Sequence, residues 1–357
     1  MMAIVIGLSL IMKGNKKGSR AFIILSVIAM FCVMGLREAT LIGIDSASSY
    51  LHTFERISEM SWAEFRQAYR GLTNPALFRL MRIVSNLSGG SYQAFVIVMS
   101  AFIMICFGHF VNRYSVSPIQ SFCYYWGLLL YVFMFSAEKQ AMAMAILLLA
   151  FDGIMEKRPV KFTLLVLLAA LFHFPALIFL PAYWLSKIRI NRNYLLILAI
   201  VLLLTYLFRD GILRLMLLAY GGEEIEATMS GMVLLRTKSI VMIGITIAAI
   251  ILRVPEEEDR LYSILLKFVG VAIVFQTFCA YNNIFERLAD YYFQFSVVFI
   301  PLVFEKKDDV RSLIDARTAS FAKSVAPYVF SAYGVYRFAG YVAADAFLTP
   351  YVFFFNK

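Results

Sequence analysis

Long apolar runs separated by short basic loops recur along this chain from one end to the other. A helix that crosses the hydrocarbon core of a bilayer needs about 20 apolar residues, and many of these runs approach that length. Hydrophobic residues make up 61% of the 357 residues and charged residues only 16%, which excludes a soluble globular fold. The sequence therefore predicts an all-α polytopic integral membrane protein, with a single membrane domain over residues 1–357.

About eleven segments are candidate transmembrane helices, and several of them are short or interrupted. The candidates are residues 2–12, 21–36, 92–111, 121–136, 140–155, 162–184, 194–208, 239–252, 261–280, 291–304 and 325–349. The net charge of +10 comes from basic residues in the short loops, so the positive-inside rule explains it and no nucleic-acid partner is expected. The sequence has no CxxC pair and its three histidines lie far apart, so we expect no metal site.

The basic loops give the chain an orientation. The loop from Lys13 to Arg20 is strongly basic and is predicted to be cytoplasmic. Segment 21–36 then leads outward, so residues 37–90 form a large external region. Alternation of the next spans places Glu138 and Lys139 at the external face.

Segment 162–184 has basic residues on both sides, which predicts cytoplasmic flanks at both ends. Two such flanks require a re-entrant hairpin broken near His173 and Pro175, and irregular backbone at that depth must line a cavity. The alternative is one ordinary span kinked by the proline. The hairpin is favoured because it also places the basic residues between 306 and 317 in the cytoplasm.

The external region is predicted to contain amphipathic helices within residues 45–88. Ser61 and Glu64 form a capping box that opens a helix with Trp62 and Phe65 on one face. Asn74 is an N-cap candidate followed by proline at the first helical position. An apolar stripe flanked by arginines, among them Arg82, suits contact with membrane lipids at the interface.

Four groups of ionisable side chains stand in or beside apolar runs. A charge at membrane depth costs roughly 2.5–3.5 kcal/mol on insertion scales, so such groups are candidates for function. The hairpin topology brings all four to the external face. They are Arg37-Glu38 with Asp45 and Tyr50, Glu138-Lys139-Gln140, His173, and Glu286-Arg287 with Asp290.

Each group also has a structural alternative. Arg37 could place its charge at the membrane surface, Glu138 and Lys139 could form an internal ion pair, and His173 could be a hydrogen-bonded core residue. Taken together, the groups favour an anionic lipid-linked substrate, since Arg and Lys bind phosphate strongly. A carboxylate or imidazole nearby would serve as a general base.

The order of these motifs resembles the EpsG family. Arg37 followed by Gly43-Ile-Asp45 and Tyr50 is similar to the opening element of that family, and Lys139-Gln140 is similar to its Arg-Gln helix. The later elements that match are Phe162 to Pro181 with His173, Arg287 before Tyr291-Tyr-Phe, and Pro350-Tyr351 with Phe353-Phe354. Lys139 departs from the arginine usual in the family, which keeps the charge but loses the bidentate fork.

The resemblance implies a Wzy-type polymerase of bacterial capsule or exopolysaccharide synthesis, similar to GT-C-like membrane glycosyltransferases. Such an enzyme joins undecaprenyl-diphosphate-linked repeat units at the external face of the cytoplasmic membrane. A flippase and a chain-length regulator of the same pathway are the partners that the resemblance suggests.

On this hypothesis the diphosphate is bound by a set of polar residues: Arg37, Lys139, Gln140, Arg287 and Tyr50. His173 is the first choice for the general base, and Glu138 and Asp45 are the second choices. Positioned cations can stabilise the diphosphate leaving group, so we expect no metal and no cofactor. The alternative functions are a flippase for the same lipid-linked unit, and a ligase-like or acyl-transferring membrane enzyme.

Overall fold

The regular structure of the protein is helical. The computed structural model describes the chain except for residues 1–15, 44, 46–48, 191–193, 212–213, 215–236, 253–258, 281–283, 306–311, 345–347, 349–350 and 356–357. Within the described part, the only β-type pairing is an isolated bridge between Arg37 and Phe353. The all-α class is confirmed, and the candidate span at 2–12 lies outside the described residues.

The chain packs as two compact units. The first unit comprises Met1–Leu180 with Tyr328–Lys357, and the second comprises Pro181–Pro327. The helices of the first unit are α2 (Lys16–Gly35), α3 (Leu51–Glu59), α4 (Trp62–Ala68), α5 (Pro75–Ser88), α6 (Tyr92–Tyr114), α7 (Pro118–Gly127), α8 (Leu130–Phe133), α9 (Glu138–Met155), α10 (Pro159–Phe172) and η2 (Phe174–Phe179). Those of the second are α11 (Ala182–Leu185), α12 (Tyr194–Leu207), α14 (Thr237–Leu252), α15 (Arg260–Thr277), η3 (Phe278–Ala280), α16 (Ile284–Phe293) and α17 (Ser296–Val303), and α18 (Ala316–Ala344) passes from the second unit into the first.

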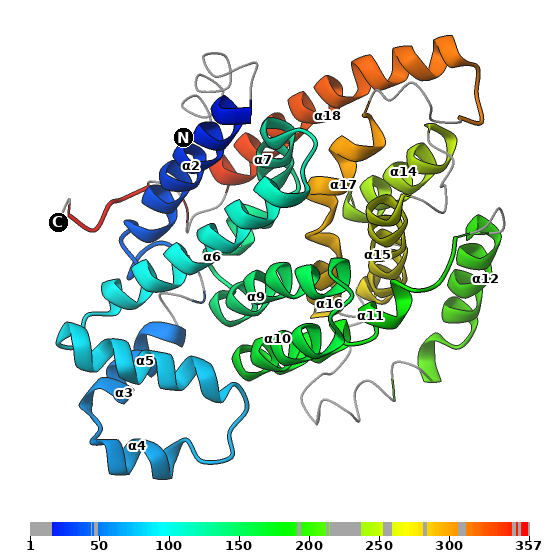
Figure 1. Ribbon diagram of the computed structural model, residues 1–357. Helices are drawn as coiled ribbons and strands as arrows, with labels where there is room; N and C mark the ends of the chain where they lie inside the picture. The colour runs from blue at the N-terminus through cyan, green and yellow to red at the C-terminus, as the bar shows by residue number, and fades with distance from the viewer. Residues whose placement is uncertain are drawn as a thin grey trace. The chain divides into compact units, whose positions relative to one another are not determined.

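The core of the first unit is a layer of long helices in which α2, α6, α9 and α10 pack side by side (Figure 1). Gly108 of α6 lies against Val27, whereas Gln93 at the start of α6 contacts Gly35 at the end of α2. These two helices are therefore antiparallel. α9 and α10 are also antiparallel, because a short turn joins them and Gly153 packs on Phe162.

The apolar helices indicate a membrane protein, although they do not establish eleven spans. Among the described helices, α6 and α15 are long and apolar enough to cross a bilayer by themselves. Other predicted spans correspond to shorter apolar helices. The outer face of α10 exposes Val160, Leu164, Leu167 and Leu171, and a continuous apolar face of this kind suits contact with lipid.

Two predicted spans are not single helices in the structure, because each is divided between two shorter helices. Segment 121–136 forms α7 and α8, which are separated at Leu129, a residue in the left-handed region with φ 62°. Segment 291–304 belongs to α16 and α17, which are separated at Gln294 and Phe295. Neither break contains a proline, so tertiary packing, which apolar periodicity cannot reveal, decides where these helices end.

The predicted break at His173 is confirmed. α10 ends at Phe172, His173 is extended with φ −150° and ψ 105°, and Pro175 lies in the 3₁₀ turn η2. On a straight helix residues 162 and 179 would be about 25 Å apart. The rings of Phe162 and Phe179 are instead 5.9 Å apart, so the chain reverses at His173 and returns along α10.

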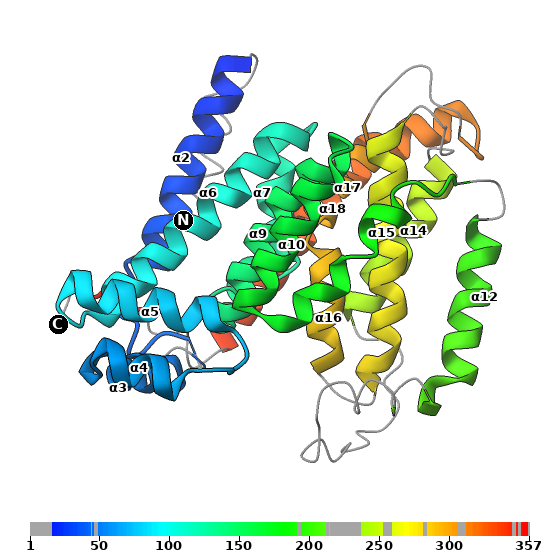
Figure 2. The same ribbon diagram turned by 60° about the horizontal axis from the view of Figure 1, so that its bottom comes forward.

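The amphipathic helices α3, α4 and α5 lie together where α6 begins (Figure 2). The capping box is confirmed. The Ser61 hydroxyl accepts from the Glu64 amide, and the Ser61 amide donates to the Glu64 carboxylate. These bonds hold the pKa of the Glu64 carboxyl below its usual range. Asn74 is confirmed as the N-cap residue of α5, with Pro75 at the start of the helix. Its side chain makes no capping bond, because its amide oxygen accepts from Phe174 N at 3.1 Å instead. One expectation was wrong. Arg82 is buried, not on an exposed flank, because it donates to the Ile57 and Ser58 carbonyls.

We predict that a side chain at Gly127 will separate α7 from the part of α18 in the first unit. A Cβ atom at Gly127 would lie 2.4 Å from the Cα of Gly334, a contact that only backbone movement can relieve. Gly127→Val should lower the free energy of unfolding by about 1–3 kcal/mol and should also lower the thermal midpoint in detergent. The midpoint is measured as the temperature at which half of the protein no longer stays monodisperse after heating. Gly340→Ala on α18 is the matched control, since nothing lies within 4 Å of its new Cβ. Equal midpoints for the two variants would contradict this packing.

Candidate functional site

Polar side chains gather at the two opposite ends of the long helices of the first unit. One end, called the Arg37 end, holds Arg37 after α2, Tyr92 at the start of α6 and Glu138 at the start of α9. The opposite end, called the Arg113 end, holds Arg113 and Asp152, which are 2.9 Å apart, with Glu156 bonded to Arg113 and Lys161. Since α6 has 23 residues, about 34 Å of helix separates the two ends.

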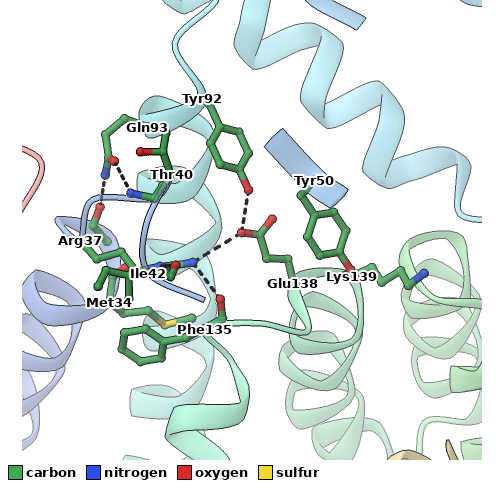
Figure 3. Close-up of polar contacts among 12 residues, drawn as sticks. Met34, Arg37, Thr40, Ile42, Tyr50, Tyr92, Gln93, Phe135, Glu138 and Lys139 are labelled. Atoms are coloured by element: carbon green, nitrogen blue, oxygen red, sulfur yellow. Dashed lines mark hydrogen bonds and ion pairs between the residues drawn. The ribbon is translucent and has the colours of Figure 1, made fainter. Parts of the chain in front are cut away.

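Arg37 is 1% exposed, and its guanidinium contacts both backbone carbonyl groups and a carboxylate (Figure 3). It donates to the carbonyl oxygens of Met34 at 2.5 Å, Ile42 at 3.3 Å and Phe135 at 3.2 Å. It also forms an ion pair with Glu138 Oε1 at 3.5 Å, and it lies 5.1 Å from the centre of the Phe135 ring. Arg37 therefore links the end of α2 to the turn that follows it and to the segment that leads into α9.

Glu138 is bonded to two side chains from other parts of the first unit. Its Oε1 atom accepts from the Tyr92 hydroxyl at 3.1 Å as well as from Arg37, and the residue is 3% exposed. The Lys139 side chain points away from Glu138 (Figure 3). Adjacent residues on a helix do not face each other, which fits the different directions of these two side chains.

Lys139 and Tyr50 are brought together by the packing of α3 near the start of α9. The Tyr50 hydroxyl accepts from the Lys139 backbone amide at 3.4 Å, and the Lys139 side chain is only partly buried. Gln140 is 1% exposed, and its amide nitrogen lies 3.9 Å from the sulfur of Met144. Asp45 is also partly buried and follows Gly43, whose φ of 99° favours glycine. The predicted residues Arg37, Tyr50, Glu138 and Lys139 therefore lie within one polar region.

The extended segment 351–354, called the C-terminal strand, forms part of this region. Phe353 pairs with Arg37 as an antiparallel bridge, and the Glu38 amide donates to the Val352 carbonyl at 2.8 Å. The Phe354 amide donates to the Leu36 carbonyl at 3.1 Å, and the Tyr351 hydroxyl donates to the Val33 carbonyl. Residues from the two ends of the sequence thus fix the backbone on both sides of Arg37.

His173 lies at the tip of the hairpin formed by α10 and η2. This tip is tied to α5, because the Phe174 amide donates to the Asn74 side chain. α9 and α10 are antiparallel neighbours of similar length, so the end of α10 lies at the same end of the unit as the start of α9. His173 is therefore at the Arg37 end, on a different element from Glu138.

The second unit has its own ionic cluster. Lys238 of α14 forms ion pairs with Glu286 at 3.0 Å and Asp290 at 2.5 Å on α16, and its ammonium lies 5.4 Å from the Phe293 ring centre. Glu286 is thus bonded to Lys238, while Arg287 is exposed on α16. Among the described residues, no group of three His, Cys, Asp or Glu side chains forms a metal site.

Sequence reasoning missed Lys238, Tyr92 and Lys267. Lys267 is 4% exposed in α15 and donates to the Ile188 carbonyl at 2.6 Å. Lys267 stands inside an apolar run, so the cost of an intramembrane charge could have identified it. Lys238 lies just before the apolar run 239–252, close to Arg236, where a basic residue is usual. Tyr92 gave no such signal, because a tyrosine at the start of an apolar helix is usual at a membrane interface.

We predict that the Arg37–Glu138 pair stabilises the first unit only while both partners are present. Arg37→Met leaves a buried carboxylate without its cation and should destabilise the unit by about 3–5 kcal/mol. The double variant Arg37→Met with Glu138→Met should recover part of that loss, because no buried charge remains. Thermal midpoints of the purified variants in detergent measure this, and a double variant less stable than Arg37→Met would contradict it.

We also predict that the C-terminal strand fixes the turn after Arg37. Phe354→Pro removes the amide that bonds to Leu36, and should raise several-fold the rate at which a maleimide labels Thr40→Cys in a Cys32→Ser background. Phe354→Leu keeps the amide and is the matched control. An unchanged labelling rate in Phe354→Pro would show that the strand does not hold this turn.

Comparison with known proteins gives a family for the chain. The EpsG family model matches residues 20–352, which include the Arg37 end, the hairpin and the first two residues of the C-terminal strand. No curated protein and no solved structure matches the chain. Together with the apolar helices, the match indicates a membrane protein of polysaccharide biosynthesis. The chain belongs to the EpsG family.

Proposed function

We propose that this protein is a Wzy-type polysaccharide polymerase. It would transfer a growing glycan from undecaprenyl diphosphate to the sugar end of another lipid-linked repeat unit, at the external face of the bacterial cytoplasmic membrane. The observation that carries the proposal is the polar region at the Arg37 end, which lies within an apolar helical unit of an EpsG chain.

The charge distribution of the first unit supports an external site. Arg113, Lys157, Arg158 and Lys161 all lie at the Arg113 end, and an excess of basic residues is typical of the cytoplasmic side. The Arg37 end is about 34 Å away along α6, a distance comparable with the hydrocarbon thickness of a bilayer. The Arg37 end would therefore face the external leaflet.

The reaction needs few chemical groups from the protein. The acceptor hydroxyl oxygen bonds to the anomeric carbon of the donor sugar while the bond from that carbon to the diphosphate oxygen breaks. The electron pair leaves with undecaprenyl diphosphate, and the hydroxyl proton passes to a base. Positioned positive charge in a low-dielectric site stabilises the departing diphosphate.

Lys139 is the residue we propose for direct contact with the diphosphate. Its ammonium points away from Glu138, and its side chain is not fully buried. Gln140 and Tyr50 are further proposed contacts. Arg287 belongs to the second unit, and its role stays an expectation from the sequence. Arg37 would reach phosphate only by releasing a carbonyl group, so we assign it chiefly to positioning Glu138 and the turn after α2.

His173 remains our first choice for the base. An imidazole is suited to proton transfer at neutral pH, and a residue at a helix break can turn toward a substrate. Glu138 is the second choice, since Arg37 and Tyr92 already bond to one of its oxygens. Asp45 is the third.

A flippase for the same lipid-linked unit is the main alternative function. Broken helices and intramembrane charges also occur in transporters, so the hairpin at His173 is compatible with either function. A flippase would move its substrate unchanged, whereas a polymerase makes a longer glycan. A ligase-like or acyl-transferring enzyme is a further alternative.

We expect Lys139→Ala to reduce polymer formation in cells on the order of 100-fold, because removing one charged hydrogen bond costs about 2–3 kcal/mol. Lys139→Arg should keep most activity, since it retains the charge. The measurement is the chain-length ladder of the surface glycan on a gel, in a strain whose only copy of the gene encodes the variant. Arg158→Ala, an exposed cation at the Arg113 end, is the matched control. A normal ladder in Lys139→Ala would reject this assignment.

His173→Ala, tested in the same strain, should abolish the ladder and leave single repeat units. His173→Gln should be no better, because an amide cannot accept the proton. Full activity in both variants would exclude His173 as the base and transfer the role to Glu138 or Asp45.

A further inference from the structure

An apolar cavity of about 110 Å³ lies in the first unit, next to the polar region. It is a half-open cavity bordered by α2, α8, α18 and the C-terminal strand, and its lining is almost entirely apolar. The residues that matter for the argument are Val33, Tyr131, Phe135, Val342 and Tyr351.

The two tyrosines of the lining use their hydroxyl groups elsewhere. The Tyr131 hydroxyl donates to the Met30 carbonyl at 2.7 Å, and the Tyr351 hydroxyl donates to the Val33 carbonyl. The cavity therefore offers ring faces and aliphatic side chains to an occupant. A site with so few polar groups suits hydrocarbon and not water or sugar.

The cavity adjoins the polar region through Phe135. This residue lines the cavity, and it also binds Arg37 through its carbonyl oxygen and its ring. Tyr351 forms another wall, one residue before the strand residues that pair with the backbone on both sides of Arg37. An occupant of the cavity would thus lie within one side chain of the Arg37–Glu138 pair.

Two of the walls belong to helices that also expose apolar side chains. α2 exposes Ile24 and Ile28, and the part of α18 in the first unit exposes Tyr333 and Tyr336. In a membrane protein such faces contact lipid, so a hydrocarbon chain can approach the cavity from the bilayer.

The volume of the cavity fits a short branched hydrocarbon group. An apolar protein cavity of ~150 Å³ can bind benzene, which has six carbons. A volume of about 110 Å³ is therefore on the scale of one five-carbon isoprenoid unit.

We propose that this cavity seats the first isoprenoid unit of the diphosphate-linked substrate, and this inference rests on the proposed function. In a prenyl diphosphate the hydrocarbon begins at the phosphate oxygen, so a dry cavity beside a polar region fits that junction. A glycerolipid would place ester groups there, and the lining has no donors for them.

Photo-crosslinking tests the proposal without requiring turnover. The probe is a short polyprenyl diphosphate with a diazirine on its first isoprenoid unit, added to the full-length protein in detergent. Mass spectrometry should find the label on α8 or on the strand at Tyr351–Phe354, and unlabelled polyprenyl diphosphate should compete with it. A phosphatidylglycerol with a diazirine in its acyl chain is the control for ordinary lipid.

Val342→Phe fills the cavity and should reduce this labelling at least tenfold. Val329→Phe, on an exposed face of the same helix, is the matched control and should label as the unchanged protein does. Absence of competition in the unchanged protein, or equal labelling of the cavity by the phosphatidylglycerol probe, would overturn the proposal. So would unchanged labelling in a folded Val342→Phe variant.

The two proposals can fail separately. If the probe labels the cavity and is competed, but the protein makes no polymer, the isoprenoid site stands and the polymerase assignment fails. If polymer forms and the cavity is not labelled, the polymerase assignment stands and the isoprenoid site is wrong.

Discussion

The buried ion pair between Arg37 and Glu138 is the interaction on which the organisation of the first unit depends. Transfer of two charges into an apolar interior is costly unless each finds further hydrogen bonds. Arg37 obtains them from three carbonyl groups, and Glu138 from the Tyr92 hydroxyl. These partners come from the end of α2, the start of α6 and the segment before α9, so the pair requires all of them to be in place at once.

The backbone around Arg37 also depends on the C-terminal strand. The strand at Tyr351–Phe354 supplies backbone partners to Leu36 and Glu38, and it closes one side of the apolar cavity. A polar region and a hydrocarbon site thereby share one wall. This arrangement suits a substrate whose anionic and hydrocarbon parts adjoin directly, which is the chemistry of a lipid diphosphate.

Much of the architecture could be predicted from the sequence because it depends on local signals. The basic flanks and Pro175 located the break at His173, and Ser61 with Glu64 located the start of α4. These features depend on residues near each other in the chain. The breaks at Leu129 and at Gln294–Phe295 have no such signal, since long-range packing decides them.

The partners within the site were less predictable. The sequence singled out Arg37 and Glu138 as unusual charges, but it could not pair them with each other, because they are 101 positions apart. The geometry of a helix already argues against the alternative in which the adjacent Glu138 and Lys139 form an ion pair. Lys238 gave no signal, because a lysine at the edge of the apolar run 239–252 is ordinary, and only the fold brings it to Glu286 and Asp290.

The central claim is that this protein itself joins lipid-linked repeat units. The most direct measurement supplies the purified protein in detergent with undecaprenyl-diphosphate-linked repeat units and resolves the products on a gel. Detergent removes the two compartments that a flippase needs, so the account predicts a ladder of longer glycans with release of undecaprenyl diphosphate. Repeat units that remain single, in the presence of folded protein and its native lipid-linked substrate, would contradict it.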